Sequence, residues 1–450
     1  MFRIARLLAR ALRAASRRVG RSGGTTAPGR LLLRLSPSAL ERMARQVDES
    51  VLVSATNGKT TTAAMVAAAL ERAGRPVVHN RAGSNMAWGV ATALLDAGRR
   101  PGEIGLFEVD EAWLLPVARD VRPRTYLLAN LFRDQLDRYG ELELLADRWA
   151  ELVGSEAGRA RFVLNADDPL VADLGRGREG VTYFGISDDS QALPALQHAA
   201  DSKHCRNCGT PYVYDAVYLG HLGRYRCPNC GRDRPEPGIV ATDVLLKGMS
   251  GSELRLRTPG GVTPLRLPLP GLYNVYNAVA AAAAALELGV GLEDVRAALE
   301  GFGGAFGRVE TIPVDGRSLS ILLVKNPAGA NEVMRTLTLE DGALDLWLAL
   351  NDGIADGRDV SWIWDADFEL LAGRARRVTC SGTRAEEMAL RLKYAGVDAE
   401  LAVDRDLGRS LDSALAGAAS DSVYALPTYT ALLELRDILA RRGLAARWSE

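Results

Sequence analysis

The sequence predicts an α/β protein with two successive sheets, of which the first carries a phosphate-binding loop and a metal-binding insertion. Three observations predict this fold class. Short apolar runs alternate with helical patterns along most of the 450 residues, as in parallel sheets with helical crossovers. One of these runs leads into a Gly-Lys-Thr turn that opens a helix. Two Cys-x-x-Cys pairs follow, at residues 205–208 and 227–230.

The composition is that of a globular protein with a large core. Apolar residues make up 47% of the chain, charged residues 25%, and the net charge is -1. These values exclude wholesale disorder and argue against a protein that binds nucleic acid by bulk electrostatics. No uninterrupted run of 18 apolar residues exists, so we expect no membrane-spanning helix. Five cysteines are too few for a disulfide framework, which indicates a reducing, cytoplasmic compartment.

Residues 1–45 form a basic N-terminal segment. Residues 2–21 place apolar side chains at helical spacing and fill the remaining positions with arginine. A secretory signal needs a longer apolar core. Two interpretations stay open: a basic amphipathic helix that lies on an anionic membrane surface, at the inner face of the cell membrane, or a solvated helix that packs on its own protein.

Residues 46–311 are predicted to form a central domain that opens with a P-loop. A buried strand at 51–55 leads into Thr56-Asn57-Gly58-Lys59-Thr60-Thr61, and a helix continues to about residue 73. Backbone N–H groups at such a helix N-terminus bind phosphate oxygens. Lys59 adds a charge near the β- and γ-phosphates of ATP, and Thr60 is a candidate Mg²⁺ ligand. Val53 stands where the motif usually has its first glycine.

Further strands are predicted at 76–80, 104–110, 125–131, 161–168 and 181–186. Their carboxyl ends are polar, and ligands bind at that edge of a parallel sheet. Carboxylates there suit Mg²⁺, whereas any one of them alone is more simply a helix cap. The polar residues at the strand ends are Asn80, Glu108, Asp110, Glu111, Asn130, Asp134, Asn165, Asp167 and Asp168.

The four paired cysteines, Cys205, Cys208, Cys227 and Cys230, have the spacing of a zinc ribbon inserted at about 201–235. Four thiolates close a tetrahedron around Zn²⁺ and leave no position for water, so the predicted site is structural. An iron–sulfur centre or a redox pair is the alternative. His204 and His221 are nearby but are not needed as ligands, and Cys380 reads as a buried strand thiol.

Residues 312–450 are predicted to form a smaller, Rossmann-like α/β domain. We expect strands at 320–327, 343–352 and 376–382, with helices at 331–339, 362–371 and 384–396. A polar cluster at 351–365 follows the second strand. It is either a capped loop or part of a site. The glycine-rich segment 301–307 lacks a preceding strand and is interpreted as a turn, not a dinucleotide site.

These motifs together resemble the Mur ligase superfamily, the ATP-dependent amide-forming enzymes of peptidoglycan assembly. The matching segments are 55–61, 80–85, 130–137, 165–169, 269–277 and 307–310, with Gln135 in place of the family's histidine. The resemblance implies that Thr56 to Thr61 bind ATP and that Glu108 joins Thr60 at Mg²⁺. It also implies adenine contacts from Asn274 and Asn277, and a nucleotide contact from Arg308.

Two departures from the family pattern concern lysine. Only five of the 55 basic residues are lysines: Lys59, Lys203, Lys247, Lys325 and Lys393. Neither Lys203 nor Lys247 has the context of the family's carbamoylated lysine, so we expect that device to be absent. The family's Asp-Tyr-Ala-His-Asn-Pro reads Leu322-Leu-Val-Lys325-Asn326-Pro327 here. The lost aspartate and histidine suggest a nucleophile other than an amino acid.

The cysteine insertion narrows the resemblance to the synthetase subunits of lipid II isoglutaminyl synthase. That resemblance implies amidation of the α-carboxylate of D-glutamate in lipid II, through an acyl phosphate. Ammonia would come from a GatD-like class I glutamine amidotransferase in a heterodimer. An acidic residue in the 351–365 cluster would either orient a catalytic histidine of that partner or position ammonia near the acyl phosphate. Asp356 is the first candidate, ahead of Asp352 and Asp359. Tyr429 and Thr430 are either contacts or helix caps.

Two rival functions stay open. One is a ligase that adds a whole amino acid, as other Mur ligases and folylpolyglutamate synthase do. The other is a nucleotide-binding scaffold without turnover.

Overall fold

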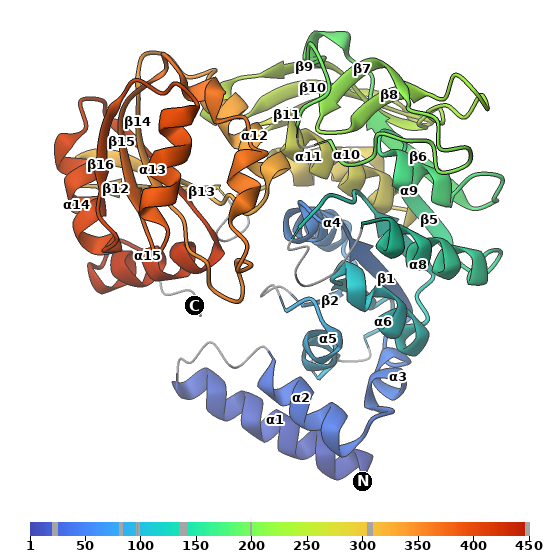
Figure 1. Ribbon diagram of the computed structural model, residues 1–450. Coiled ribbons are helices and arrows are strands. Elements are labelled where there is room, and N and C mark those ends of the chain that lie inside the picture. The colour runs from blue at the N-terminus through green and yellow to red at the C-terminus, as the bar shows by residue number, and fades with distance from the viewer. Residues whose placement is uncertain are drawn as a thin grey trace.

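Two sheets, one from each half of the chain, organise the protein (Figure 1). The computed structural model describes residues 1–19, 26–80, 84–95, 97, 100–134, 142–198, 200–303 and 309–445. The first sheet has nine strands in the order β11-β10-β9-β6-β5-β4-β1-β3-β2, and the second has six in the order β12-β13-β17-β14-β15-β16. A two-stranded sheet, β7-β8, belongs to the insertion between β6 and β9.

The first sheet confirms the five predicted strands that follow the P-loop and the strand that precedes it. All six pair in parallel, and β9 continues the parallel arrangement beside β6. β10 and β11 then extend the sheet antiparallel, an extension not predicted from the sequence. The strands are β1 (Glu49–Ser54), β2 (Val77–His79), β3 (Ile104–Glu108), β4 (Thr125–Leu128), β5 (Arg161–Asn165), β6 (Val181–Ile186), β9 (Ile239–Leu246), β10 (Ser252–Thr258) and β11 (Gly261–Leu267).

Helices cover both faces of this sheet because successive strand residues point to opposite sides. Val51 and Val53 of β1 face one core, and Leu52 between them faces the other. The first core is closed by α4 (Lys59–Arg72), α10 (Leu272–Glu287) and α11 (Leu292–Glu300). The second is closed by α1 (Phe2–Val19), α2 (Ala27–Leu35), α3 (Ala39–Ala44), α5 (Ala87–Leu94), α6 (Leu114–Val121), α8 (Leu142–Ser155) and α9 (Pro169–Leu174).

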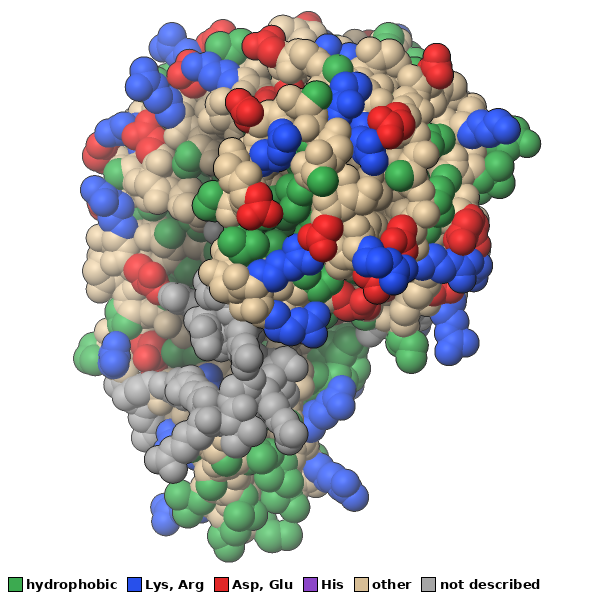
Figure 2. All heavy atoms as spheres, turned by 90° about the vertical axis from the view of Figure 1, so that its left-hand side faces the viewer, with side chains coloured by type: hydrophobic (Ala, Val, Ile, Leu, Met, Phe, Trp, Pro, Cys, Tyr) green, Lys and Arg blue, Asp and Glu red, His purple; other side chains and the backbone are tan. Residues whose placement is uncertain are grey.

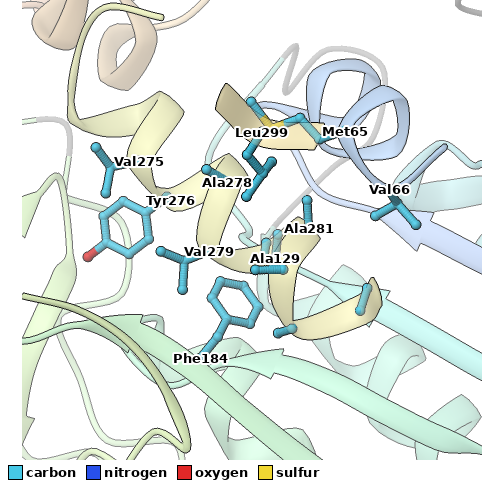
Figure 3. Close-up of a cluster of buried hydrophobic side chains, with 14 of the residues drawn as sticks. Met65, Val66, Ala129, Phe184, Val275, Tyr276, Ala278, Val279, Ala281 and Leu299 are labelled. Carbon is cyan, nitrogen blue, oxygen red and sulfur yellow. The ribbon is translucent and has the colours of Figure 1, made fainter. Parts of the chain in front are cut away.

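The alanine-rich run of α10 fixes the distance between α10 and its neighbours. Residues 278–285 are alanine except for Val279, and all are buried. Figure 3 shows Ala278 and Ala281 among Met65 of α4, Phe184 of β6 and Leu299 of α11. Small side chains let helices approach closely, so the start of α10 lies against the start of α4. That contact brings α10 to the P-loop.

The second sheet confirms the Rossmann-like region, and all its strand pairs are parallel except β12-β13. The predicted division between residues 311 and 312 falls inside β12. The expected helix at 362–371 is wrong, because the segment forms two short 3₁₀ turns, Ser361–Trp364 and Phe368–Leu371. The elements are β12 (Val309–Val314), β13 (Arg317–Leu322), α12 (Pro327–Leu337), β14 (Leu344–Ala349), β15 (Ala375–Ser381), α13 (Ala385–Tyr394), β16 (Glu400–Val403), α14 (Leu407–Gly417), β17 (Ser422–Pro427) and α15 (Tyr429–Arg441).

Helix α12 joins the second sheet to the first. Its Arg335 donates to the backbone oxygens of Tyr218 and Gln191, each over 3.0 Å. Glu340, just after the helix, accepts from the Met249 amide over 2.7 Å. On the same helix Glu332 is buried, and its carboxylate accepts no hydrogen bond from the described residues. The nearest cation is Arg335, at 3.6 Å.

Burial raises the pKa of Glu332 to about 7, although Arg335 opposes the shift. Between about pH 4.5 and pH 7 the folded chain therefore keeps a proton that the unfolded chain has lost, and stability falls as the pH rises. We predict that Glu332→Gln increases the free energy of unfolding by roughly 2 kcal/mol at pH 8 and leaves it unchanged near pH 4. Denaturant unfolding at both pH values measures this. Glu179→Gln, at an exposed position, is the control, and an equal effect at both pH values would contradict the assignment.

Candidate functional site

The P-loop is shaped by a glycine that lies against α10. Gly58 caps α4 with φ 82°, in the left-handed region that favours glycine. A Cβ atom built there would lie 2.0 Å from Oδ1 of Asn277, so no larger residue fits. That same oxygen accepts from the Thr62 hydroxyl over 3.2 Å, and the Asn277 amide donates to Asn274 over 3.0 Å. Asn274 and Asn277 are thus buried supports of the loop in this structure.

Lys59 lies buried between carboxylates. Its Nζ donates to Glu111 over 2.7 Å and also to the backbone oxygen of Ala55. Burial lowers the pKa of Lys59, but the charges of Glu111, Asp110 and Glu108 outweigh it, so the pKa lies above its usual value. The ammonium group therefore stays charged and is available to phosphate oxygens.

Thr60 and Glu108, the two predicted Mg²⁺ ligands, lie in contact with each other. The Thr60 hydroxyl donates to Oε1 of Glu108 over 3.0 Å. Asn80 holds Glu108 at the end of β3 by pairing with its backbone, through bonds of 2.8 Å and 2.9 Å. A hydroxyl and a carboxylate at the mouth of a phosphate loop are hard oxygen ligands, which fits Mg²⁺ shared with nucleotide phosphates.

Asn130 and Asp134 bring the end of β4 to the same loop. Asn130 accepts from the Asn57 amide over 2.9 Å and donates to the Asn57 carbonyl over 3.0 Å. Thr56 accepts from the Phe132 amide over 3.0 Å. The polar residues predicted at the ends of β1, β3 and β4 therefore meet around one loop.

The second sheet contributes Lys325, which replaces the histidine of the family motif, and Asn326, which matches its asparagine. Lys325 pairs with Asp134 and donates to the Thr56 carbonyl over 3.2 Å. Asn326 donates to Oδ1 of Asn57 over 3.0 Å. Burial raises the pKa of Glu111, but Lys59 and Lys325 together hold it below its usual value. The scarcity of lysine was the available signal, since two of only five lysines meet at this loop.

Asp356 lies elsewhere, at the carboxyl edge of the second sheet. It is buried, and its Oδ1 accepts from the Thr430 amide over 2.8 Å while Oδ2 accepts from the Thr430 hydroxyl. Burial raises the pKa of Asp356, opposed by these hydrogen bonds. Asp352 pairs with Arg384 over 2.8 Å, and Asp359 accepts from the Ser361 amide, as a turn cap does. Arg308 and Gln135 lie outside the described residues.

The four predicted cysteines form one cluster. Their sulfur atoms all lie within 4.8 Å of one another, with 3.6 Å between Cys205 and Cys230 and 3.4 Å between Cys208 and Cys227. A tetrahedral zinc–thiolate site with bonds near 2.3 Å has sulfur separations of about 3.8 Å, so the cluster fits Zn²⁺. The adjoining strands are β7 (Val213–Leu219) and β8 (Leu222–Arg226). Neither His204 nor His221 belongs to the cluster.

The insertion also supports the site. Asp201 pairs with the Arg133 side chain and accepts from its amide over 2.9 Å. His221 is fully buried, with Nε2 3.4 Å from Asp168 and its ring 4.6 Å from that of Phe132. Asp168 in turn accepts from the Leu131 amide over 2.9 Å. The cysteine insertion thus contacts and supports residues 131–134, and these residues in turn contact the P-loop.

Solved structures with the same architecture show which fold this chain has. The chain aligns with a pseudomurein peptide ligase type C from Methanothermus fervidus with a TM-score of 0.69, 23% identity, and coverage of 88% of this chain and 79% of that one. MurF from Acinetobacter baumannii gives a TM-score of 0.66 at 19% identity, over 92% and 80% of the two chains. The fold is that of the Mur-type ligases, and residues 53–230 match the Mur ligase middle domain.

Sequence comparison then shows to which family of these ligases the chain belongs. Residues 323–432 match the MurT ligase C-terminal family. The subunit MurT of lipid II isoglutaminyl synthase (glutamine-hydrolyzing) from Staphylococcus aureus is 32% identical, over 96% of this chain and 97% of that protein. The MurT subunit from Streptococcus pneumoniae is 30% identical, over 96% and 95%. The chain belongs to the MurT family of Mur-type ligases.

We predict that Lys325→Met weakens ATP binding about tenfold, because Asp134 and Glu111 would then face the phosphates without this cation. Isothermal titration with ATP and Mg²⁺ measures the change. Asp134→Asn in the Lys325→Met background should restore part of the affinity, and Lys393→Met, at an exposed lysine, is the control. Unchanged affinity in Lys325→Met would show that this lysine plays no part in the nucleotide site.

We also predict that zinc loss impairs ATP binding indirectly. Cys227→Ser should release the metal, lower the Tm by roughly 5 °C or more and weaken ATP binding, because residues 131–134 lose their support. Asp201→Ala should weaken ATP binding while zinc content, measured by atomic absorption, stays at one ion per chain. Full ATP affinity in the zinc-free protein would contradict the connection.

Proposed function

We propose that this chain is the synthetase subunit of a lipid II isoglutaminyl synthase. It would phosphorylate the α-carboxylate of D-glutamate in the lipid II stem peptide with ATP and amidate the acyl phosphate with ammonia. The observation that carries the proposal is the site shared by the two sheets: P-loop Lys59 and Thr60, the acids of β3 and β4, and Lys325 with Asn326 from the second sheet. Relatives of this name match along nearly the whole chain.

The roles of the site residues follow from their charge and position. A carboxylate cannot expel oxide, so its oxygen must first become part of a phosphate leaving group. Lys59 and the N-terminal amides of α4 would bind the transferred phosphoryl group and offset its charge, which accounts for most catalysis of this kind. Thr60 and Glu108 would hold Mg²⁺, which neutralises phosphate charge when bound. The hydrogen bond between Asn57 and Asn326 would hold the second sheet against the P-loop, beside the reacting groups.

The choice of ammonia over an amino acid rests on the second sheet. The Asp and His of the family's amino-acid-adding motif are absent, and Lys325 occupies this segment in contact with the P-loop. A lysine adds positive charge beside a developing acyl phosphate without offering the hydrogen-bond acceptors that bind an incoming ammonium group. An amino-acid-adding ligase of the Mur or folylpolyglutamate synthase type, or a scaffold without turnover, is the alternative.

A glutaminase subunit of the GatD-like class I amidotransferase type would supply the ammonia as a heterodimeric partner. Asp356 lies in the loop after β14, and the neighbouring Ile354 is 80% exposed. Trp364 and Tyr394 are also exposed and pack edge to face at 5.6 Å on the same domain. Exposed aromatic and aliphatic side chains of this kind are typical of protein interfaces. We propose that Asp356 orients a catalytic group of the partner, with Thr430 fixing its carboxylate.

We propose that the enzyme works in the cytoplasm, at the inner face of the cell membrane, because ATP and a lipid-linked substrate would meet there. Among the described residues no helix has the length and apolar character needed to cross a bilayer. Contact with the membrane would therefore be peripheral.

Mass spectrometry of lipid II treated with the protein, ATP and Mg²⁺ tests the proposal. With ammonium salt we expect conversion of one carboxylate to a carboxamide and release of ADP, and Lys59→Ala should lose at least about a thousandfold in rate. Addition of an amino acid, judged by product mass, would favour the ligase alternative. ADP release that never depends on substrate, with or without a partner, would favour the scaffold.

Comparing the rates with glutamine and with ammonium salt tests whether Asp356 acts through the glutaminase or in the synthetase reaction. In the complex with the glutaminase, Asp356→Asn should lose about a hundredfold or more with glutamine and keep its rate with ammonium salt. Asp352→Asn is the matched control in the same loop and should keep both activities. Equal loss with both nitrogen sources would place Asp356 in the synthetase reaction or in folding.

A further inference from the structure

Three of the large apolar side chains on the first helix point away from the protein, whereas Phe2 and Leu12 are half-buried. Met1 and, on α1, Ile4, Leu7 and Leu8 are 90%, 62%, 67% and 49% exposed, and Ala11 and Ala15 continue the same stripe at helical spacing. The side chains buried beneath α1 are small, Ala5 and Ala9. A helix that only packs on its own protein shows the reverse arrangement, with its large apolar residues inward.

Helix α1 is nevertheless held firmly. Arg10 and Arg13 donate to the backbone oxygens of Leu95 and Thr92 at the end of α5, over 3.0 Å and 2.6 Å. Arg6 donates to Gln46 over 2.9 Å. Beneath it, Gly29 of α2 approaches the Trp88 carbonyl so closely that an added Cβ would lie 1.8 Å away. The exposed stripe therefore belongs to an anchored helix.

Charge is divided sharply between this segment and the rest of the chain. The first 40 residues contain nine arginines and no acidic residue, and the other 410 residues contain 46 basic and 56 acidic residues. Figure 2 shows hydrophobic side chains with basic ones beside them at the lower end of the molecule, where Figure 1 places α1 and α2. An apolar stripe flanked by arginine matches the boundary between anionic headgroups and acyl chains.

The same features argue against other occupants. A second copy docked on this face would bring its own basic, acid-free first 40 residues close to these, and like charges across an interface oppose association.

We propose that the outer face of α1, formed by Met1, Ile4, Leu7, Leu8, Ala11 and Ala15, docks on an anionic lipid bilayer with the helix axis in the membrane plane. This deepens the proposed function by giving a surface that holds the site near a lipid-linked substrate. The attachment through α5 is continuous with the site, because Asn80 and Ser84, just before α5, are hydrogen-bonded to each other and Asn80 holds Glu108.

Cosedimentation of the full-length protein with vesicles tests the proposal. Vesicles of phosphatidylcholine with phosphatidylglycerol should bind the protein, phosphatidylcholine alone should bind it more weakly, and added salt should weaken binding to the anionic vesicles. The double variant Leu7→Glu/Leu8→Glu should lose about tenfold or more of this affinity with an unchanged Tm. Leu245→Glu, on β9 and 54% exposed, is the matched control and should bind as the unchanged protein does.

Absence of binding to anionic vesicles, or binding that survives the double variant, overturns the proposal. The proposal is also overturned if the unchanged protein is a dimer in solution and the double variant is a monomer. Loss of glutaminase binding by the double variant overturns it too, because either result would make this face a protein interface. Ammonium-dependent amidation of a water-soluble, short-chain lipid II analogue should be the same for the double variant. If the unchanged protein lacks that activity the proposed function fails, whereas the vesicle result stands apart from it.

Discussion

A buried ammonium group needs carboxylates within reach, and Lys59 imposes this requirement on the whole site. Glu111 lies 2.7 Å away, and Asp110 and Glu108 add to the negative charge. Those acids would repel a polyphosphate if they stood alone. Lys325 enters from the second sheet, pairs with Asp134 and acts on Glu111. The site is thus a balanced set of charges drawn from strand ends of both sheets, and neither sheet holds that balance alone.

Packing, as well as charge, fixes the geometry of the site. The alanines of α10 bring its first turn against α4, and Asn277 then fills the space that only a glycine at position 58 leaves open. Residues 131–134 are held on their other side by Asp201 and His221 of the cysteine insertion. A loop that must bind a mobile phosphate chain is in this way fixed by groups that do not contact the phosphates, as preorganised sites require.

Much of this arrangement could be predicted because its signals are local. The strand and turn around Gly58, the spacing of the four cysteines and the polar ends of β3 and β4 are each short patterns with a physical meaning. The contact of Lys325 with Thr56 could not be predicted, because it joins residues 269 apart in the chain through the docking of two sheets. The segment 362–371 shows the same limit. Its apolar spacing suits a helix, but Asp367 in its middle is hydrogen-bonded to Asn331 of α12, which favours two short turns.

The cysteine insertion supports the predicted ATP site although it contributes none of the residues predicted to bind phosphate. Its metal would sit among four thiolates, away from phosphate and substrate, yet the residues beside it brace the loop that meets the P-loop. Cys230 lies at the surface of this cluster, open to chelators and oxidants. Loss of a metal from this cluster would therefore disturb the P-loop through residues 131–134, without a change in any residue predicted to bind phosphate.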